Sequence, residues 1–180
     1  MFIANELRKK SIAEYLLYRW QVEITRMAFG CQLGRRGRKY IAHFDYGDEQ
    51  KDEETDWFGN LIRMMNEEGK RESGHLQINM VTLQLMEELH QQLLSSSKYP
   101  FYTSEYYKVL PFIVELRNKG ANKDEHEIET CLNSLYGVMM LRLKKATISP
   151  DTEHAVKEIS TLIGMLSDYY HKDKEEPLEF

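Results

Sequence analysis

Apolar residues recur along most of the chain at the three- and four-residue intervals of an α-helix, and no segment shows the alternation of a strand. Capping residues, glycines and prolines divide this pattern into segments. The sequence predicts about six main helices, near residues 11–28, 49–68, 74–95, 103–119, 123–145 and 150–171. Short connections between them predict an all-α, single-domain bundle over residues 1–172, followed by a loose acidic tail at 173–180.

Local signals support several of these limits. Ser11 followed three residues later by Glu14 has the spacing of a capping box at a helix start. Ser149 followed by Pro150 is typical of a cap with proline at the first helical position. The glycine-punctuated stretch 30–47 is the least regular part of the chain, with at most one short helix predicted inside it.

The segment YPFYTSEYYKVLPFI (99–113) holds six aromatic rings in fifteen positions. On a helical wheel Tyr102, Tyr106, Val109 and Ile113 share one side, within an apolar arc that covers more than half of the circumference. This arc predicts a central core helix whose tyrosine hydroxyls reach polar partners at its rim. We therefore expect Tyr106 to lie in the core, while a pocket or an oligomer seam remains the alternative.

Pro111 falls inside this predicted helix. Proline has no backbone N–H, so the bond to the carbonyl of Tyr107 is lost and the axis bends. A bend at this point either serves packing or opens a small cavity in the bundle.

Polar residues on apolar helix faces predict a buried network. If the third helix faces the first, Asn79 and His90 would meet Glu14 and Tyr18. Such a network either fixes helix register or lines a pocket. The candidate ligand-binding residues are those four together with the tyrosines beside Pro111: Glu14, Tyr18, Asn79, His90, Tyr106 and Tyr107.

Composition and charge narrow the classes of function. Charged residues make up 29% of the chain and hydrophobic residues 42%, which indicates a globular protein. The net charge of -5 disfavours nonspecific nucleic-acid binding. The basic loop Arg35–Lys39 has the chemistry to bind RNA or phosphate, but the acidic run Asp45–Asp56 follows directly, so neutralisation within the chain is favoured.

Two cysteines, Cys31 and Cys131, lack metal-ligand spacing and suggest a reducing, cytoplasmic location. The N-terminal residues have the wrong charge order for a signal peptide, and no apolar stretch approaches the ~20 residues of a membrane span. We therefore expect no membrane contact.

Glu87 and His90 have the Glu-x-x-His spacing of di-iron carboxylate bundles, which need a second such pair. The nearest second copy, Asp151 with His154, places its histidine away from the apolar face. We therefore predict no metal and no cofactor. No phosphate loop, dinucleotide fingerprint or nucleophile elbow occurs, so we assign no catalytic residue and expect no enzymatic activity.

Four runs carry a resemblance to a known family: IAEYLLYRWQVE (12–23), GHLQINMVTL (74–83), YPFYTSEYYKVLPFIVELRNKGANKD (99–124) and ETCLNSLYGVMMLRLKKATIS (129–149). The chain resembles, over nearly its full length, a family of uncharacterised helical proteins from Bacteroides and its relatives, designated a domain of unknown function. The resemblance implies a helical, bacterial, single-domain protein and implies no activity.

Three functions remain open at this point. The first is a non-catalytic bundle that binds a protein partner or itself, supported by wide apolar arcs on several helices. The second is a small-molecule-binding bundle with a polar pocket beside Pro111. The third is RNA or phosphate binding through Arg35–Lys39.

Overall fold

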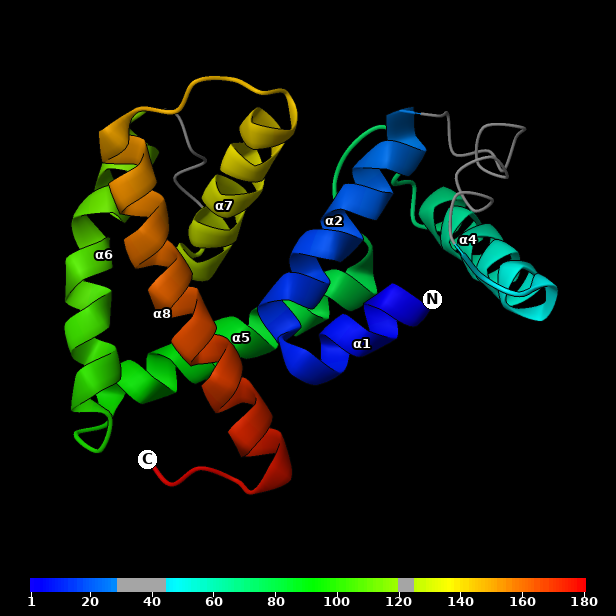
Figure 1. Cartoon of the computed structure of the whole chain (residues 1–180). Coiled ribbons are helices and arrows are strands. Elements are labelled where there is room, and N and C mark those ends of the chain that lie inside the picture. The colour runs from blue at the N-terminus through cyan, green and yellow to red at the C-terminus, as the bar shows by residue number, and fades with distance from the viewer. Residues whose placement is uncertain (29–44, 120–124) are drawn as a thin grey trace. The chain divides into compact units, whose positions relative to one another are not determined.

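The computed structural model describes residues 1–28, 45–119 and 125–180. Within these ranges all regular secondary structure is α-helical and no strand occurs, which confirms the all-α prediction (Figure 1). The helices are α1 (Phe2–Lys10), α2 (Ile12–Ala28), α4 (Asp48–Glu67), α5 (Gln77–Ser95), α6 (Pro100–Asn118), α7 (Glu127–Leu143) and α8 (Pro150–Glu175). The basic loop Arg35–Lys39, Cys31 and the predicted short helix lie outside the described residues.

Helix starts differ from the sequence-based limits by three residues or more at four places, one of which is α7, which begins at Glu127 rather than near residue 123. The sequence pattern missed α1, whose last turn carries Arg8, Lys9 and Lys10, as suits a helix C-terminus. Helix α6 begins at Pro100, three residues early, because proline suits the first helical position. Helix α5 begins late, since Gly74 has a φ of 83°, outside the helical region.

The described residues divide into two compact units. The first comprises Met1–Lys10 and Glu14–Val81, and the second comprises Ser11–Ala13 and Thr82–Phe180. The single-domain boundary at residue 172 stays a prediction.

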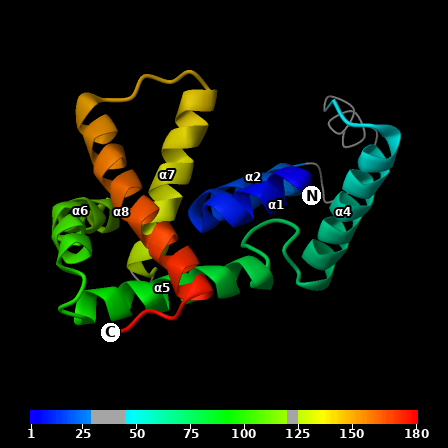
Figure 2. The same cartoon turned by 60° about the horizontal axis from the view of Figure 1, so that its bottom comes forward.

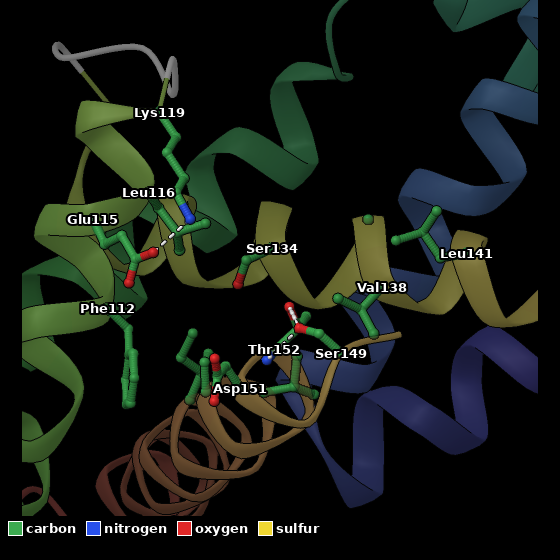
Figure 3. Close-up of a pocket in the computed structure, with 14 residues that line it drawn as sticks. Phe112, Glu115, Leu116, Lys119, Ser134, Val138, Leu141, Ser149, Asp151 and Thr152 are labelled. Carbon is green, nitrogen blue, oxygen red and sulfur yellow. Dashed lines mark hydrogen bonds and ion pairs between the residues drawn. The ribbon is translucent and has the colours of Figure 1, made fainter. Parts of the chain in front are cut away.

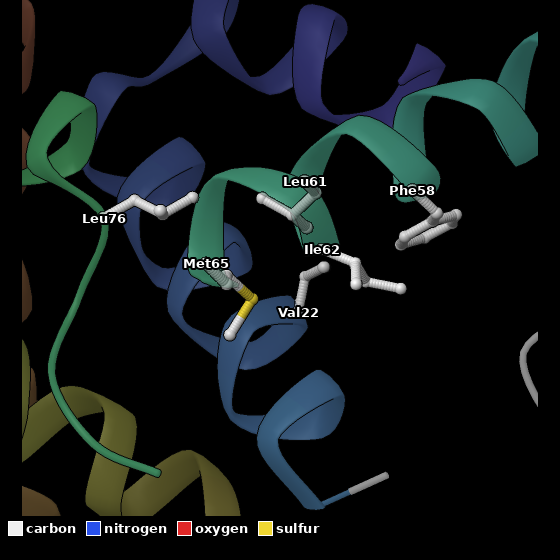
Figure 4. Packing of buried hydrophobic residues seen from close by; sticks show 6 residues of the cluster. All are labelled: Val22, Phe58, Leu61, Ile62, Met65 and Leu76. Carbon is white, nitrogen blue, oxygen red and sulfur yellow. The ribbon is translucent and has the colours of Figure 1, made fainter. Parts of the chain in front are cut away.

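In the first unit, α2 and α4 share an apolar core. The cluster consists of Val22, Phe58, Leu61, Ile62, Met65 and Leu76 (Figure 4). The buried carboxylate of Glu54 on α4 accepts hydrogen bonds from the Met1 amino group and from the Phe2 backbone N–H. These contacts fasten the start of α1 to α4.

In the second unit, α6 packs against α8, and α7 packs against both. Tyr102, Val109 and Ile113 are buried, which confirms the central line of the predicted arc on α6. One flank of that arc is exposed, with Tyr107 64% and Val114 50% accessible. The apolar face that α6 uses for packing is therefore narrower than the one the sequence predicts.

The expected loose tail is partly helical and partly packed. Helix α8 continues to Glu175. Beyond it, the backbone carbonyl of Glu179 accepts a hydrogen bond of 2.9 Å from the Tyr99 hydroxyl, and the rings of Phe180 and Tyr99 lie 5.8 Å apart. The tail thus lies against the turn that precedes α6.

Two helices end on residues with positive φ, Gly69 at 68° and Lys145 at 55°. After each, the next residue donates its N–H to the carbonyl five residues back, at 2.7 Å for Lys70 and 3.0 Å for Ala146. This is the Schellman arrangement, which favours glycine at the left-handed position because a Cβ is strained there.

We predict that Lys145→Gly raises the free energy of unfolding by about 0.5–1 kcal/mol, because it removes that strain at the end of α7. Lys144→Gly is the matched control, since Lys144 has an ordinary φ of -80° and glycine there should lower stability. Urea titrations of both variants provide the measurement, and an unchanged or lower midpoint for Lys145→Gly would contradict the prediction.

Candidate functional site

A buried carboxylate organises the polar residues of the first unit. Glu23 is fully buried and accepts hydrogen bonds from the Nδ2 amide of Asn79 and, at 2.8 Å, from Nδ1–H of His75. Trp20 stacks on the His75 ring with a centroid distance of 4.5 Å. Asn79 therefore bonds to Glu23, one turn beyond the Glu14 to Tyr18 segment that the sequence suggested.

In the second unit, Glu87 and His90 of α5 both bind the first turn of α7. The Glu87 carboxylate accepts the Ile128 backbone N–H at 3.1 Å, which satisfies one of the unpaired donors at a helix start. His90 lies 3.3 Å from the Glu127 carboxylate through Nε2. The Glu87 and His90 pair with Glu-x-x-His spacing thus binds the N-terminus of α7.

The tyrosines of α6 complete this network. With the imidazole neutral and protonated on Nε2, the Tyr102 hydroxyl donates to His90 Nδ1 at 2.6 Å, and Nε2–H donates to Glu127. The Tyr106 hydroxyl donates to the other Glu127 oxygen at 3.2 Å. Both ring nitrogens of His90, both tyrosine hydroxyls and both Glu127 oxygens thus have a partner, as a rigid buried polar network requires.

The pKa shifts agree with a structural role for this network. Burial, followed by nearby negative charge, raises the pKa of Tyr102, and burial with the Glu127 hydrogen bond raises the pKa of Tyr106 to about 12. Burial raises the pKa of the Cys131 thiol to about 12. The hydrogen bond from His90 lowers the pKa of Glu127. Both phenols and the thiol are protonated at neutral pH, so none of them is an activated nucleophile.

Metal chemistry finds no support in the described ranges. Within residues 1–28, 45–119 and 125–180, no group of three or more His, Cys, Asp or Glu side chains is arranged to hold a metal ion. Glu87 and His90 bind α7, while Asp151 and His154 are exposed on α8.

The six candidate ligand-binding residues divide between the two units, with Glu14, Tyr18 and Asn79 in the first and His90, Tyr106 and Tyr107 in the second. Glu14 is exposed and Tyr18 packs beside the core cluster of the first unit. His90 and Tyr106 do meet, with ring centroids 5.2 Å apart, and Tyr107 lies beside Tyr106 with its ring exposed. Tyr106 is half-buried, so the core position predicted for it belongs to Tyr102.

A cavity of about 600 Å³ lies in the second unit among α6, α7 and the start of α8 (Figure 3). Three segments line it: Phe112, Glu115 and Leu116 of α6 with the following Lys119; Ser134, Gly137, Val138 and Leu141 of α7; and Ser149 with Asp151, Thr152, Ala155, Val156 and Ile159 of α8. Helices α7 and α8 diverge toward the loop that joins them, as Figure 1 and Figure 2 show. The cavity lies at this wider end.

Small side chains on the α7 wall leave the space open. A Cβ added at Gly137 would meet no atom within 4 Å, and the Ser134 hydroxyl bonds back to the Cys131 carbonyl at 2.7 Å. The cavity residues were missed from the sequence. A glycine and a serine one turn apart on an otherwise apolar helix were the available signal.

The polar groups of the cavity are partly paired. The Lys119 ammonium bonds to the Glu115 carboxylate, and the Ser149 hydroxyl caps α8 by accepting the Thr152 N–H at 3.2 Å. Asp151 makes no hydrogen bond or ion pair with the described residues. An apolar floor with a few polar groups at one side is the usual composition of a small-molecule site.

The fold and this cavity define an all-α helical-bundle protein with an apolar recess between three of its helices. The chain belongs to the family described as Domain of unknown function (DUF4924), whose model matches residues 1–177. No curated protein and no solved structure matches the chain. Among the described residues, no helix is both long and apolar enough to cross a membrane.

We predict that Tyr102→Ala destabilises the protein by about 3–5 kcal/mol, because it removes a fully buried ring and leaves a cavity. Tyr106→Ala should cost only about 1–2 kcal/mol, since that ring is half-buried and loses one hydrogen bond. Denaturant titration measures both. Equal losses for the two variants would contradict the assignment of Tyr102 as the core tyrosine.

Glu127 should make stability depend on acid pH. Its folded-state pKa lies below the ordinary 4.5, so the folded state binds the proton less readily than the unfolded state. The carboxylate therefore stabilises the fold above pH 4.5, and this contribution is lost as pH falls through the folded-state pKa.

We expect Glu127→Gln to flatten the stability profile in this acid window, whereas Glu67→Gln, at an exposed carboxylate of α4, should leave its slope unchanged. Thermal melts from pH 6 down to about pH 3 give the comparison. Identical slopes for the wild type and Glu127→Gln would show that the His90 contact does not favour the ionised carboxylate.

Proposed function

We propose that this chain is a non-catalytic binding protein whose ligand site is the α6–α7–α8 cavity. The observation that carries the proposal is the cavity itself, because about 600 Å³ falls inside the ~300–1,000 Å³ range of small-molecule sites. Phe112, directly after Pro111, lines this cavity, but none of the six candidate residues from the sequence does, so the proposed site differs from the polar pocket that the sequence allowed beside that proline.

The cavity chemistry favours binding over catalysis. The described residues of its lining include no histidine and no cysteine. The Ser134 hydroxyl donates to a backbone carbonyl, and the Ser149 hydroxyl accepts a backbone N–H. Neither of these hydrogen bonds joins the serine to a general base that would activate it as a nucleophile. Phe112, Val138 and Ile159 instead offer apolar surface. A ligand would gain its affinity from burial of its own apolar surface.

Association with a protein partner or a second copy is a second candidate. Tyr107 and Val114 lie one above the other on α6 and are exposed, which leaves an apolar strip available for contact. The RNA or phosphate alternative depends on Arg35–Lys39, outside the described residues, and stays a prediction. From the family resemblance and the two lone cysteines we also propose a bacterial origin and a cytoplasmic location.

We predict that Gly137→Leu abolishes binding of a small apolar probe, 1-octanol, because the added side chain fills the space in front of α7. The variant should fold, since leucine is about 1 kcal/mol more favourable than glycine in a helix interior. Gly164→Leu is the matched control, as this exposed α8 glycine also has an open Cβ position and does not line the cavity.

Amide shifts of the ¹⁵N-labelled full chain locate the probe. Octanol-dependent shifts at Gly137, Leu141 and Ala155 in the wild type and in Gly164→Leu would support the site. Absence of these shifts in the wild type would overturn it. Native mass spectrometry of the same sample distinguishes a ligand retained on the 21.3 kDa chain from a larger assembly, which would favour the second candidate.

A further inference from the structure

The charged groups of the cavity are unequally paired. Among the described residues that line it, the ionisable side chains are Glu115, Lys119 and Asp151, which together carry a net charge of one negative unit. The Lys119 ammonium is already bonded to Glu115. The uncompensated charge is therefore the carboxylate of Asp151.

Asp151 is not needed to cap α8. Pro150 has no N–H, the Thr152 N–H is bound by the Ser149 hydroxyl at 3.2 Å, and the Glu153 N–H bonds to the Ser149 carbonyl at 3.0 Å. Asp151 gains some stability from its place in the first helical turn, as any carboxylate there does. Its oxygens nevertheless remain available on the cavity side of the helix (Figure 3).

In the part of the chain that the structure describes, the nearby cations do not neutralise Asp151. Arg142, near the end of α7, pairs with Glu153, and Lys119 pairs with Glu115. His154, one turn after Asp151, lies against the Phe112 ring at 5.8 Å and forms no ion pair with the carboxylate. An anionic ligand would meet Asp151 in the cavity and be repelled, whereas a cation would find a partner there.

We propose that the cavity selects a small amphipathic cation, with an apolar body against Phe112, Val138 and Ile159 and a protonated amine paired with Asp151. This inference rests on the binding function proposed above and adds the charge of the ligand. The cavity volume of about 600 Å³ is that of a small-molecule site, so the cation is a small molecule.

The test compares three probes with the same eight-carbon chain: octylammonium, 1-octanol and octanoate. At pH 7 a primary amine is protonated, as the ordinary lysine pKa of about 10.4 indicates. We expect octylammonium to bind about fivefold or more tightly than 1-octanol, the size of a partly exposed ion pair, and octanoate to bind most weakly. Shifts of the Gly137, Leu141 and Ala155 amides give the dissociation constants.

Two variants of equal charge change isolate the carboxylate. Asp151→Asn should bring the octylammonium and octanol constants within about twofold, while Asp168→Asn, an exposed position on α8 outside the cavity, should keep the preference. Octanol binding without any charge preference, or a preference that survives Asp151→Asn, overturns this inference alone. Absence of cavity shifts with all three probes overturns the binding site itself.

Discussion

The unpaired donors at the start of α7 impose the constraint on which the second unit depends. A buried backbone N–H without a partner costs about 1–3 kcal/mol, so the Ile128 N–H must be satisfied where it lies. Glu87 supplies the acceptor, and His90, one turn further along α5, takes the neighbouring carboxylate of Glu127. On α6, Tyr102 binds His90 and Tyr106 binds Glu127. The first turn of α7 therefore fixes the packing of α5, α6 and α7 together.

The same constraint explains where space remains. The first turns of α7 carry most of its buried side chains, whereas Val138 is buried further along and Leu141 and Leu143 at the other end are exposed. A helix held firmly at one end and joined to α8 by a loop at the other can diverge without losing its anchored contacts. The cavity is therefore a product of tight packing elsewhere in the bundle.

Much of the fold follows from periodicity, and little of the site does. Tyr102, Val109 and Ile113 share a helical face, so the sequence alone identifies them as buried. The partner of Glu87 is a backbone N–H on another helix, which no side-chain pattern reveals. Tyr106 has nearly the same angular position as Tyr102, yet only the neighbours decide that one is enclosed and the other lies at the rim. Helix α1 was missed, and no side-chain pattern reveals the Glu54 contact that fastens its first residues to α4.

Cys131 gives the second unit an internal reporter of its own motions. The thiol is fully buried on α7, next in the sequence to Leu132, and burial holds its pKa near 12. Thiolates rather than thiols react with alkylating reagents, so this residue is protected twice, by access and by protonation. Modification identified at Cys131 would therefore record how often α7 separates from its neighbours, in the way that slow amide exchange records local unfolding.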